Sequence, residues 1–97
     1  MSGYDYYRLQ EFYDRILSKW KGKIQTLEKC CEDSRRLLNT NTQAKLLSQL
    51  ENLKSYFYSA KYYATTQEEN KIKVLKEIIA EMKKLEFEIK SELKKSN

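Results

Sequence analysis

The chain has 97 residues, contains no histidine and no proline, and carries a formal net charge of +5. This length fits one small domain, and a charged fraction of 34% predicts a polar, mildly basic surface around one slim core. Histidine, the commonest general base of enzymes, is missing, and with only two glycines there is no glycine-rich loop to cradle a phosphate. The carboxylates are scattered on charged helix faces. We therefore expect that the protein is not an enzyme.

The ends and the cysteines predict a reduced, cytoplasmic protein. The first residues show no basic start followed by an apolar run, which is the pattern of a secretory signal. No stretch approaches the roughly 18 consecutive apolar residues that cross a membrane. Cys30 and Cys31 are neighbours whose side chains would point about 100° apart on a helix, so we expect two free thiols. A metal site would need further ligands, so we expect no metal and no cofactor.

Apolar residues recur every three or four positions along most of the chain, which is the spacing of helices that bury one face. In the first part of the chain this stripe runs from Leu9 to Leu38 and passes through Gly22 in phase. One glycine costs a helix interior about 1 kcal/mol relative to alanine, so it can end a helix but need not. If the chain turns there, helices cover 4–19 and 22–38. If it does not, one first helix of about 35 residues forms.

The second half of the chain predicts two further helices. The polar run 39–42 is a break with two possible N-caps, and the heptad-like apolar stripe after it predicts a helix over 43–63. A second break follows, and the last apolar stripe predicts a helix over 66–94. Threonine and glutamate are spaced there as in a capping box. The two possible pairs are Thr65 with Glu68 and Thr66 with Glu69.

These elements predict an all-α fold, and the short connections predict antiparallel packing. We favour an antiparallel four-helix bundle. A first helix of about 35 residues would extend about 52 Å, whereas the second would cover only about 32 Å and leave much of its apolar face without a partner. The alternative is a three-helix bundle with a continuous long first helix. In either arrangement residues 1–97 form a single helical-bundle domain.

Tyrosine and lysine are the residue types that stand out on the expected surface. Four of the eight tyrosines open the chain and four lie near the end of the helix expected over 43–63. They either widen the core at its margin or form an aromatic recognition surface, because tyrosine adds contact area at little cost in entropy. Glutamates in the last helix nearly balance its lysines, which indicates a solvated face. We therefore expect no nucleic-acid partner.

The tripeptide Trp20-Lys21-Gly22 resembles the turn signature of the WXG-type helical-hairpin proteins that Gram-positive bacteria secrete. Those proteins are of similar length, but their signature lies near the middle, between two long helices. Here it lies about a fifth of the way along the chain, and the C-terminal export signal of that family is not evident. The resemblance predicts an alternative function, that of a small helical interaction partner of a secretion system or another helical adaptor.

A second resemblance covers roughly residues 9–80. Its three stretches are LQEFYDRI at 9–16, LLSQL at 46–50 running on to YFYSA at 56–60, and TTQEEN at 65–70 with the apolar positions after it. Their order resembles the bacteriocin immunity proteins of the class IIa, or enterocin A, type. The resemblance implies a cytoplasmic four-helix bundle that is often basic. This chain lacks the irregular tail that many members carry after the last helix.

The resemblance implies a protein that protects its producer cell from a pore-forming class IIa-type bacteriocin, and we expect the protein to be a monomer. Protection would come from non-catalytic binding to the membrane sugar permease, of the mannose-type phosphotransferase class, once the bacteriocin has docked on it. The family's specificity is assigned to the C-terminal half, and positive charge would favour the inner membrane surface. The residues we expect to bind the partner are Tyr56, Tyr62, Tyr63, Lys83, Lys84, Lys90 and Lys94.

Overall fold

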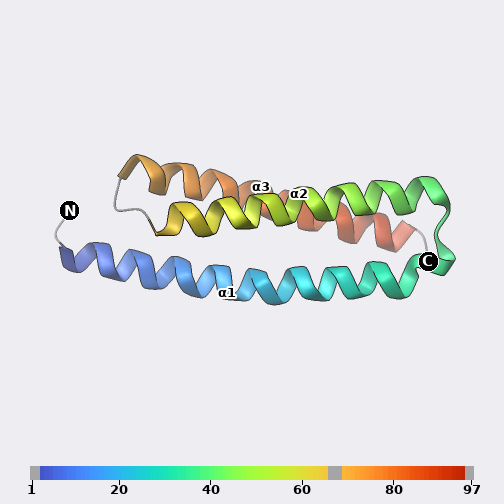
Figure 1. Cartoon of the computed structure of the whole chain (residues 1–97), viewed down its shortest axis with the longest axis horizontal. Coiled ribbons are helices and arrows are strands. Elements are labelled where there is room, and N and C mark those ends of the chain that lie inside the picture. The colour runs from blue at the N-terminus through green and yellow to red at the C-terminus, as the bar shows by residue number, and fades with distance from the viewer. Residues whose placement is uncertain (1–2, 66–68, 96–97) are drawn as a thin grey trace.

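The computed structural model describes residues 3–65 and 69–95, and the regular structure in these ranges is entirely helical. In chain order the elements are α1 (Gly3–Ser34), the short 3₁₀ turn η1 (Arg35–Leu37), α2 (Thr40–Ala64) and α3 (Glu69–Lys95). The three long helices run side by side, each antiparallel to the one before it (Figure 1). The prediction of an all-α fold is confirmed, whereas the prediction of four helices is wrong.

α1 continues through Gly22, so separate helices over 4–19 and 22–38 do not form. The backbone of Gly22 keeps a negative φ, and its carbonyl accepts a hydrogen bond of 3.0 Å from Thr26 Oγ1. The neighbouring stripe residues Trp20 and Ile24 are both buried. Burying a large apolar side chain contributes about 1.5–3 kcal/mol, which exceeds the cost of about 1 kcal/mol for one helical glycine. Tertiary packing on both sides therefore keeps the helix continuous.

A long first helix finds partners because α2 is longer than expected and α3 is longer still. The helices α1, α2 and α3 contain 32, 25 and 27 residues, which correspond to about 48, 38 and 40 Å. α2 begins at Thr40 rather than at 43, because the Oδ1 atom of Asn39 caps it by accepting a hydrogen bond of 2.8 Å from the Thr42 N–H. The N-terminal end of α1 still extends past the end of α2 (Figure 1).

The second connection is described only in part. α2 ends at Ala64, and the Thr65 hydroxyl donates a hydrogen bond of 2.7 Å to the Tyr62 carbonyl just after the helix. Both predicted capping boxes and the predicted start of a helix at 66 involve residues 66–68, which lie outside the described residues. α3 is described from Glu69 and ends at Lys95, one residue later than predicted.

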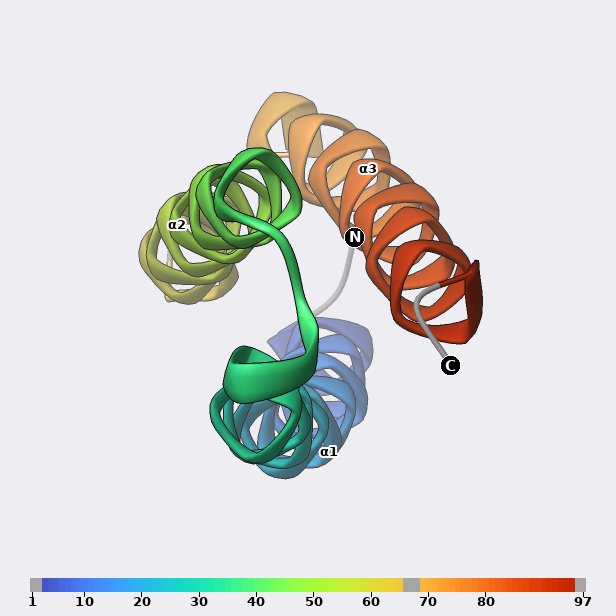
Figure 2. The ribbon, with the colours of Figure 1, turned by 90° about the vertical axis from the view of Figure 1, so that its right-hand side faces the viewer.

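The core is one apolar stripe that extends along the three helices. Leu53 of α2 and Leu75, Met82 and Ile89 of α3 are fully buried in it. α2 and α3 share the most extensive contact, whereas α1 packs chiefly against α2 and meets α3 at fewer places. Viewed end-on, the helices occupy the corners of a triangle (Figure 2). The bundle is therefore an α2–α3 hairpin with α1 laid along it.

The molecule is a rod of 53 × 19 × 16 Å. Its accessible surface of 7083 Å² is about a fifth larger than the roughly 5,900 Å² typical of a folded protein of 11.7 kDa. Much of each helix therefore faces solvent, and candidate functional residues lie on outer faces and in grooves between helices. None of the helices in the described ranges is sufficiently long and apolar to traverse a lipid bilayer.

Candidate binding surfaces

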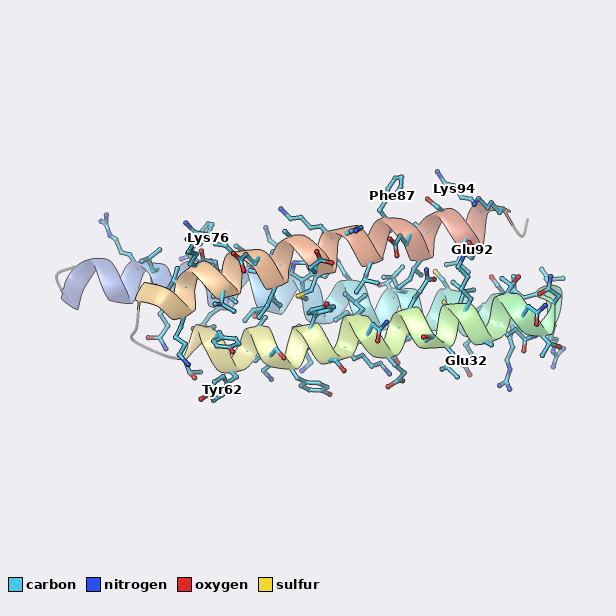
Figure 3. The ribbon with its side chains drawn as sticks, turned by 90° about the horizontal axis from the view of Figure 1, so that it is seen from above. Glu32, Tyr62, Lys76, Phe87, Glu92 and Lys94 are labelled. Carbon is cyan, nitrogen blue, oxygen red and sulfur yellow. The ribbon has the colours of Figure 1, made fainter. Side chains whose placement is uncertain are left out.

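The seven residues predicted to bind a partner are spread along the rod and do not gather in a single site. Because α2 and α3 are antiparallel, Tyr62 lies towards one end of the molecule and Lys94 towards the other (Figure 3). The residues fall into three groups. One is the aromatic end of α2, the second is a groove between α2 and α3, and the third is the outer face of α3.

At the aromatic end of α2, two adjacent tyrosines have different surroundings. Tyr62 is exposed, whereas Tyr63 is half-buried and packs against the core. Their rings meet edge to face with centroids 5.4 Å apart, and the Nζ atom of Lys71 lies 5.3 Å from the centroid of Tyr63. Tyr63 therefore widens the core at its margin, and Tyr62 remains on the surface. Tyr58, which the sequence analysis did not select, is also exposed.

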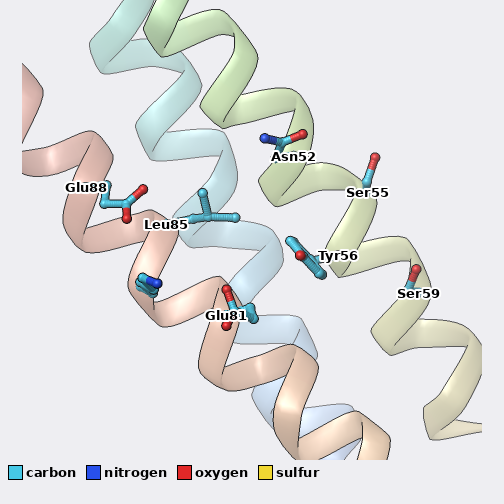
Figure 4. A pocket seen from close by; sticks show the side chains of 8 residues that line it. Asn52, Ser55, Tyr56, Ser59, Glu81, Leu85 and Glu88 are labelled. Atoms are coloured by element: carbon cyan, nitrogen blue, oxygen red, sulfur yellow. The ribbon is translucent and has the colours of Figure 1, made fainter.

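A groove between α2 and α3, here called the α2–α3 groove, brings two predicted residues together. Tyr56 projects from α2 into the space that Leu85 and Glu81 border from α3 (Figure 4), and Lys84 lines the same groove. The groove has a volume of about 390 Å³. Its lining residues are Asn52, Ser55, Tyr56, Ser59, Glu81, Lys84, Leu85 and Glu88. It therefore offers hydrogen-bond donors, acceptors and charges of both signs around one aromatic ring.

The remaining predicted lysines lie on the solvent side of α3. Lys83, Lys90 and Lys94 are all exposed. The Nζ atom of Lys90 lies 3.7 Å from a carboxylate oxygen of Glu86, one turn earlier on the same helix. No ion pair is seen for Lys83 or Lys94 within the described part of the chain. These lysines belong to a different surface from the aromatic end of α2.

A second groove, here called the α1–α2 groove, was not predicted from the sequence. It has a volume of about 530 Å³ and lies between the C-terminal part of α1 and the first half of α2. Leu38, Leu46 and Leu50 form a buried apolar floor, and exposed Leu47 lies at the mouth. The doublet Leu46-Leu47 carried the signal, because Leu47 lies about 100° around the helix from Leu46 and so falls off the stripe of Leu46, Leu50 and Leu53 that α2 buries.

An ion pair across the α1–α2 groove links the two helices. The Nζ atom of Lys54 lies 3.2 Å from Glu28 of α1 and 3.8 Å from Glu51 of α2. The hydrogen bond to Glu28 raises the pKa of Lys54 above its ordinary value, so the ammonium stays charged at neutral pH. Burial raises the pKa of the Cys31 thiol in the same groove, which favours the protonated form. Cys30 and Cys31 are both free cysteines, as predicted.

The arrangement of these surfaces allows recognition by contact, through an aromatic ring, charges and an apolar floor. Among the residues of the described ranges, no group of three or more cysteine, aspartate or glutamate side chains could hold a metal ion. No protein-family model matches the chain, and neither a curated protein nor a solved structure matches it. The likeness to the class IIa immunity family therefore depends on the ordered sequence features alone.

Proposed function

We propose that the chain is a bacteriocin immunity protein, which protects its producer cell from a pore-forming class IIa-type bacteriocin. It acts from the cytoplasm by non-catalytic binding at the complex of the bacteriocin with a membrane sugar permease. Support comes from the ordered sequence features over roughly residues 9–80. Four helices are implied by the resemblance, whereas the described residues form three α-helices, so the proposal takes from the family its mode of action and not its topology.

The observation that carries the proposal is the α2–α3 groove. It lies in the C-terminal half of the chain, to which the resemblance assigns specificity, and it holds Tyr56 and Lys84 together. Tyr56 is 37% exposed, so its ring is partly held by packing and still has surface to offer a partner. A tyrosine that is held in this way adds contact area without losing much conformational entropy on binding. Glu81 and Glu88 beside Lys84 suit a polar segment with charges of both signs.

Expression of the chain in a bacteriocin-sensitive host tests this function. We expect the wild-type chain to raise the minimal inhibitory concentration of at least one class IIa bacteriocin. The double variant Tyr56→Ser with Lys84→Gln should lose most of this protection, because truncating a buried anchor of an interface costs more than about 1 kcal/mol, or at least about fivefold in affinity.

The matched control is Tyr58→Ser with Lys19→Gln, which removes the same side-chain types from exposed positions outside the groove. It should protect as well as the wild type, and melting temperatures should show that both variants remain folded. Absence of resistance to every class IIa peptide tested would refute the immunity function. Equal protection by the two double variants would refute the role of the α2–α3 groove.

The alternative, a helical adaptor, is favoured by the apolar α1–α2 groove with Leu47 at its mouth. The WXG-type form of this alternative loses support, because Trp20-Lys21-Gly22 lies inside α1 and forms no turn. A photo-crosslinking residue at position 47 would distinguish the adaptor from the immunity function. An adaptor should give one stoichiometric cross-linked partner in cells that have not been exposed to a bacteriocin. As a control, the same photo-crosslinking residue at position 18, on the exposed surface of α1, should give no cross-linked partner.

A further inference from the structure

Lysines and glutamates occupy different sides of α3. A count of the two residue types does not show this separation, because their numbers are similar. With 3.6 residues per turn, six lysines fall within about 60° of Phe87 on the helix circumference. Over 73–94 no glutamate falls in that sector. All six lysines are exposed, and Phe87 is 72% exposed. The surface, here called the lysine face, consists of Phe87, Lys73, Lys76, Lys83, Lys84, Lys90 and Lys94.

Two glutamates of α3 outside this sector form ion pairs with the neighbouring helices. Glu86 lies 3.6 Å from Lys23 of α1, and Glu92 lies 3.2 Å from Lys45 of α2. Figure 3 shows Lys76, Phe87 and Lys94 on one side of α3 and Glu92 on the other. Glu86 and Glu92 therefore link α3 to the rest of the bundle, whereas the six lysines lie on its outer surface.

This separation makes the molecule strongly asymmetric in charge. The whole chain has 19 lysines and arginines against 14 aspartates and glutamates. With the six lysines of the lysine face set aside, 13 cations remain against 14 anions, so the rest of the chain is close to neutral. Essentially all of the net charge lies on one side of the rod, with an exposed aromatic ring near its middle.

We propose that the lysine face docks on the surface of a phospholipid bilayer rich in anionic headgroups, with Phe87 inserted among the headgroups. Lys76 and Lys94 are about 27 Å apart along a straight helix, so one plane can meet the whole row at once. Juxtamembrane lysines are attracted by anionic lipid, and an exposed phenylalanine favours the headgroup boundary.

A nucleic-acid duplex fits this surface less well. Its phosphates follow a curved backbone, and the row on α3 contains no arginine, which is the usual residue for paired contacts to phosphates. An exposed phenylalanine at the centre of the row has no role against a duplex phosphate backbone. The planar lipid surface uses both the charges and the ring, so we assign the lysine face to lipid.

Docking in this way would lay the rod flat and hold the α2–α3 groove beside the membrane, because Lys84 belongs to both surfaces. The relevance of docking to immunity rests on the proposed function. Binding to vesicles, however, is a property of the purified chain. Lipid binding without resistance would refute only the immunity function, and resistance without lipid binding would refute only this inference.

Co-sedimentation with vesicles of phosphatidylcholine and about one third phosphatidylglycerol tests the inference at low and physiological salt. The wild-type chain should bind these vesicles and should not bind pure phosphatidylcholine. The triple variant Lys76→Gln, Lys83→Gln, Lys94→Gln should lower the partition coefficient roughly 100-fold, because each lysine near an anionic surface contributes about a fivefold factor.

The matched control is Lys19→Gln, Lys21→Gln, Lys29→Gln, which removes the same charge from exposed positions of α1. It should bind far better than the α3 triple variant. Equal losses in the two triple variants would overturn the inference, because net charge alone would then explain binding. Binding to duplex DNA together with failure to bind the anionic vesicles would overturn it in favour of a nucleic-acid partner.

The variant Phe87→Trp tests whether the aromatic side chain at position 87 inserts among the lipid headgroups. Trp20 is the single native tryptophan and is 2% exposed, so its emission should stay constant as the folded protein binds. The new tryptophan should shift its emission to the blue on anionic vesicles and be quenched by brominated lipid. Unchanged emission from protein that has bound the vesicles would overturn the insertion of Phe87.

Discussion

Replacing Gly22 by alanine should stabilise the protein, because this glycine lies inside the continuous helix α1. A Cβ atom at position 22 meets nothing within 4 Å, and the backbone has no positive φ there, so the added methyl group brings no strain. Alanine is favoured over glycine in a helix interior by about 0.8–1.0 kcal/mol. In a domain of this size, 1 kcal/mol raises the melting temperature by roughly 4–8 °C.

The assay is urea and thermal unfolding followed by far-ultraviolet circular dichroism, with Gly22→Pro as the opposite perturbation. Proline at position 22 removes one helical N–H donor and clashes with the carbonyl of Ser18, which should cost about 3 kcal/mol or more. If the chain turned at Gly22, alanine would be the destabilising residue and proline would be tolerated. That reversed order would refute both the continuous helix and the packing argument for it.

Two further predictions concern the core. Leu53→Ala should lower the free energy of unfolding by about 2–5 kcal/mol, because Leu53 is fully buried. Leu47→Ala should change it by less than about 0.5 kcal/mol, because the Leu47 side chain is 62% exposed. Similar losses for the two variants in urea unfolding would contradict the assigned core. Burial raises the pKa of Tyr13 above its ordinary value of 10.0. Stability from the neutral phenol is therefore complete below about pH 10 and is lost as pH rises through the folded pKa, because the unfolded chain ionises first. Tyr13→Phe should reduce this alkaline loss in unfolding curves, and parallel pH profiles for variant and wild type would contradict the burial argument.

Much of the fold could be predicted because the signal is local. The stripe that predicts the helix over 43–63 contains the residues that α2 buries, from Leu46 to Ala64. The continuity of α1 could not be predicted in the same way. It depends on whether burial of Trp20 and Ile24 outweighs a cost of about 1 kcal/mol at Gly22, and that burial exists only in the assembled bundle.

The candidate surfaces likewise differ in whether they depend on a local sequence pattern or on packing between helices. The lysine face depends only on helical periodicity, so a helical projection of the last segment would have found it where a charge count did not. The α1–α2 groove is lined by residues of α1, α2 and the connection between them, so its shape depends on how these elements pack, and the sequence offered only exposed Leu47 as a sign of it. The different surroundings of Tyr62 and Tyr63 likewise depend on where α2 meets its neighbours.

The uneven contacts of α1 give the molecule a preferred way to open. α1 is attached mainly along α2, and its link to α3 includes the ion pair of Lys23 with Glu86 described above. It joins α2 through a short connection at Arg35–Leu37. Local unfolding should therefore release α1 as a unit and leave the hairpin of α2 and α3 closed. The indole of Trp20 would enter water in that partly open state, so the intrinsic fluorescence of the chain is a built-in sensor of the detachment.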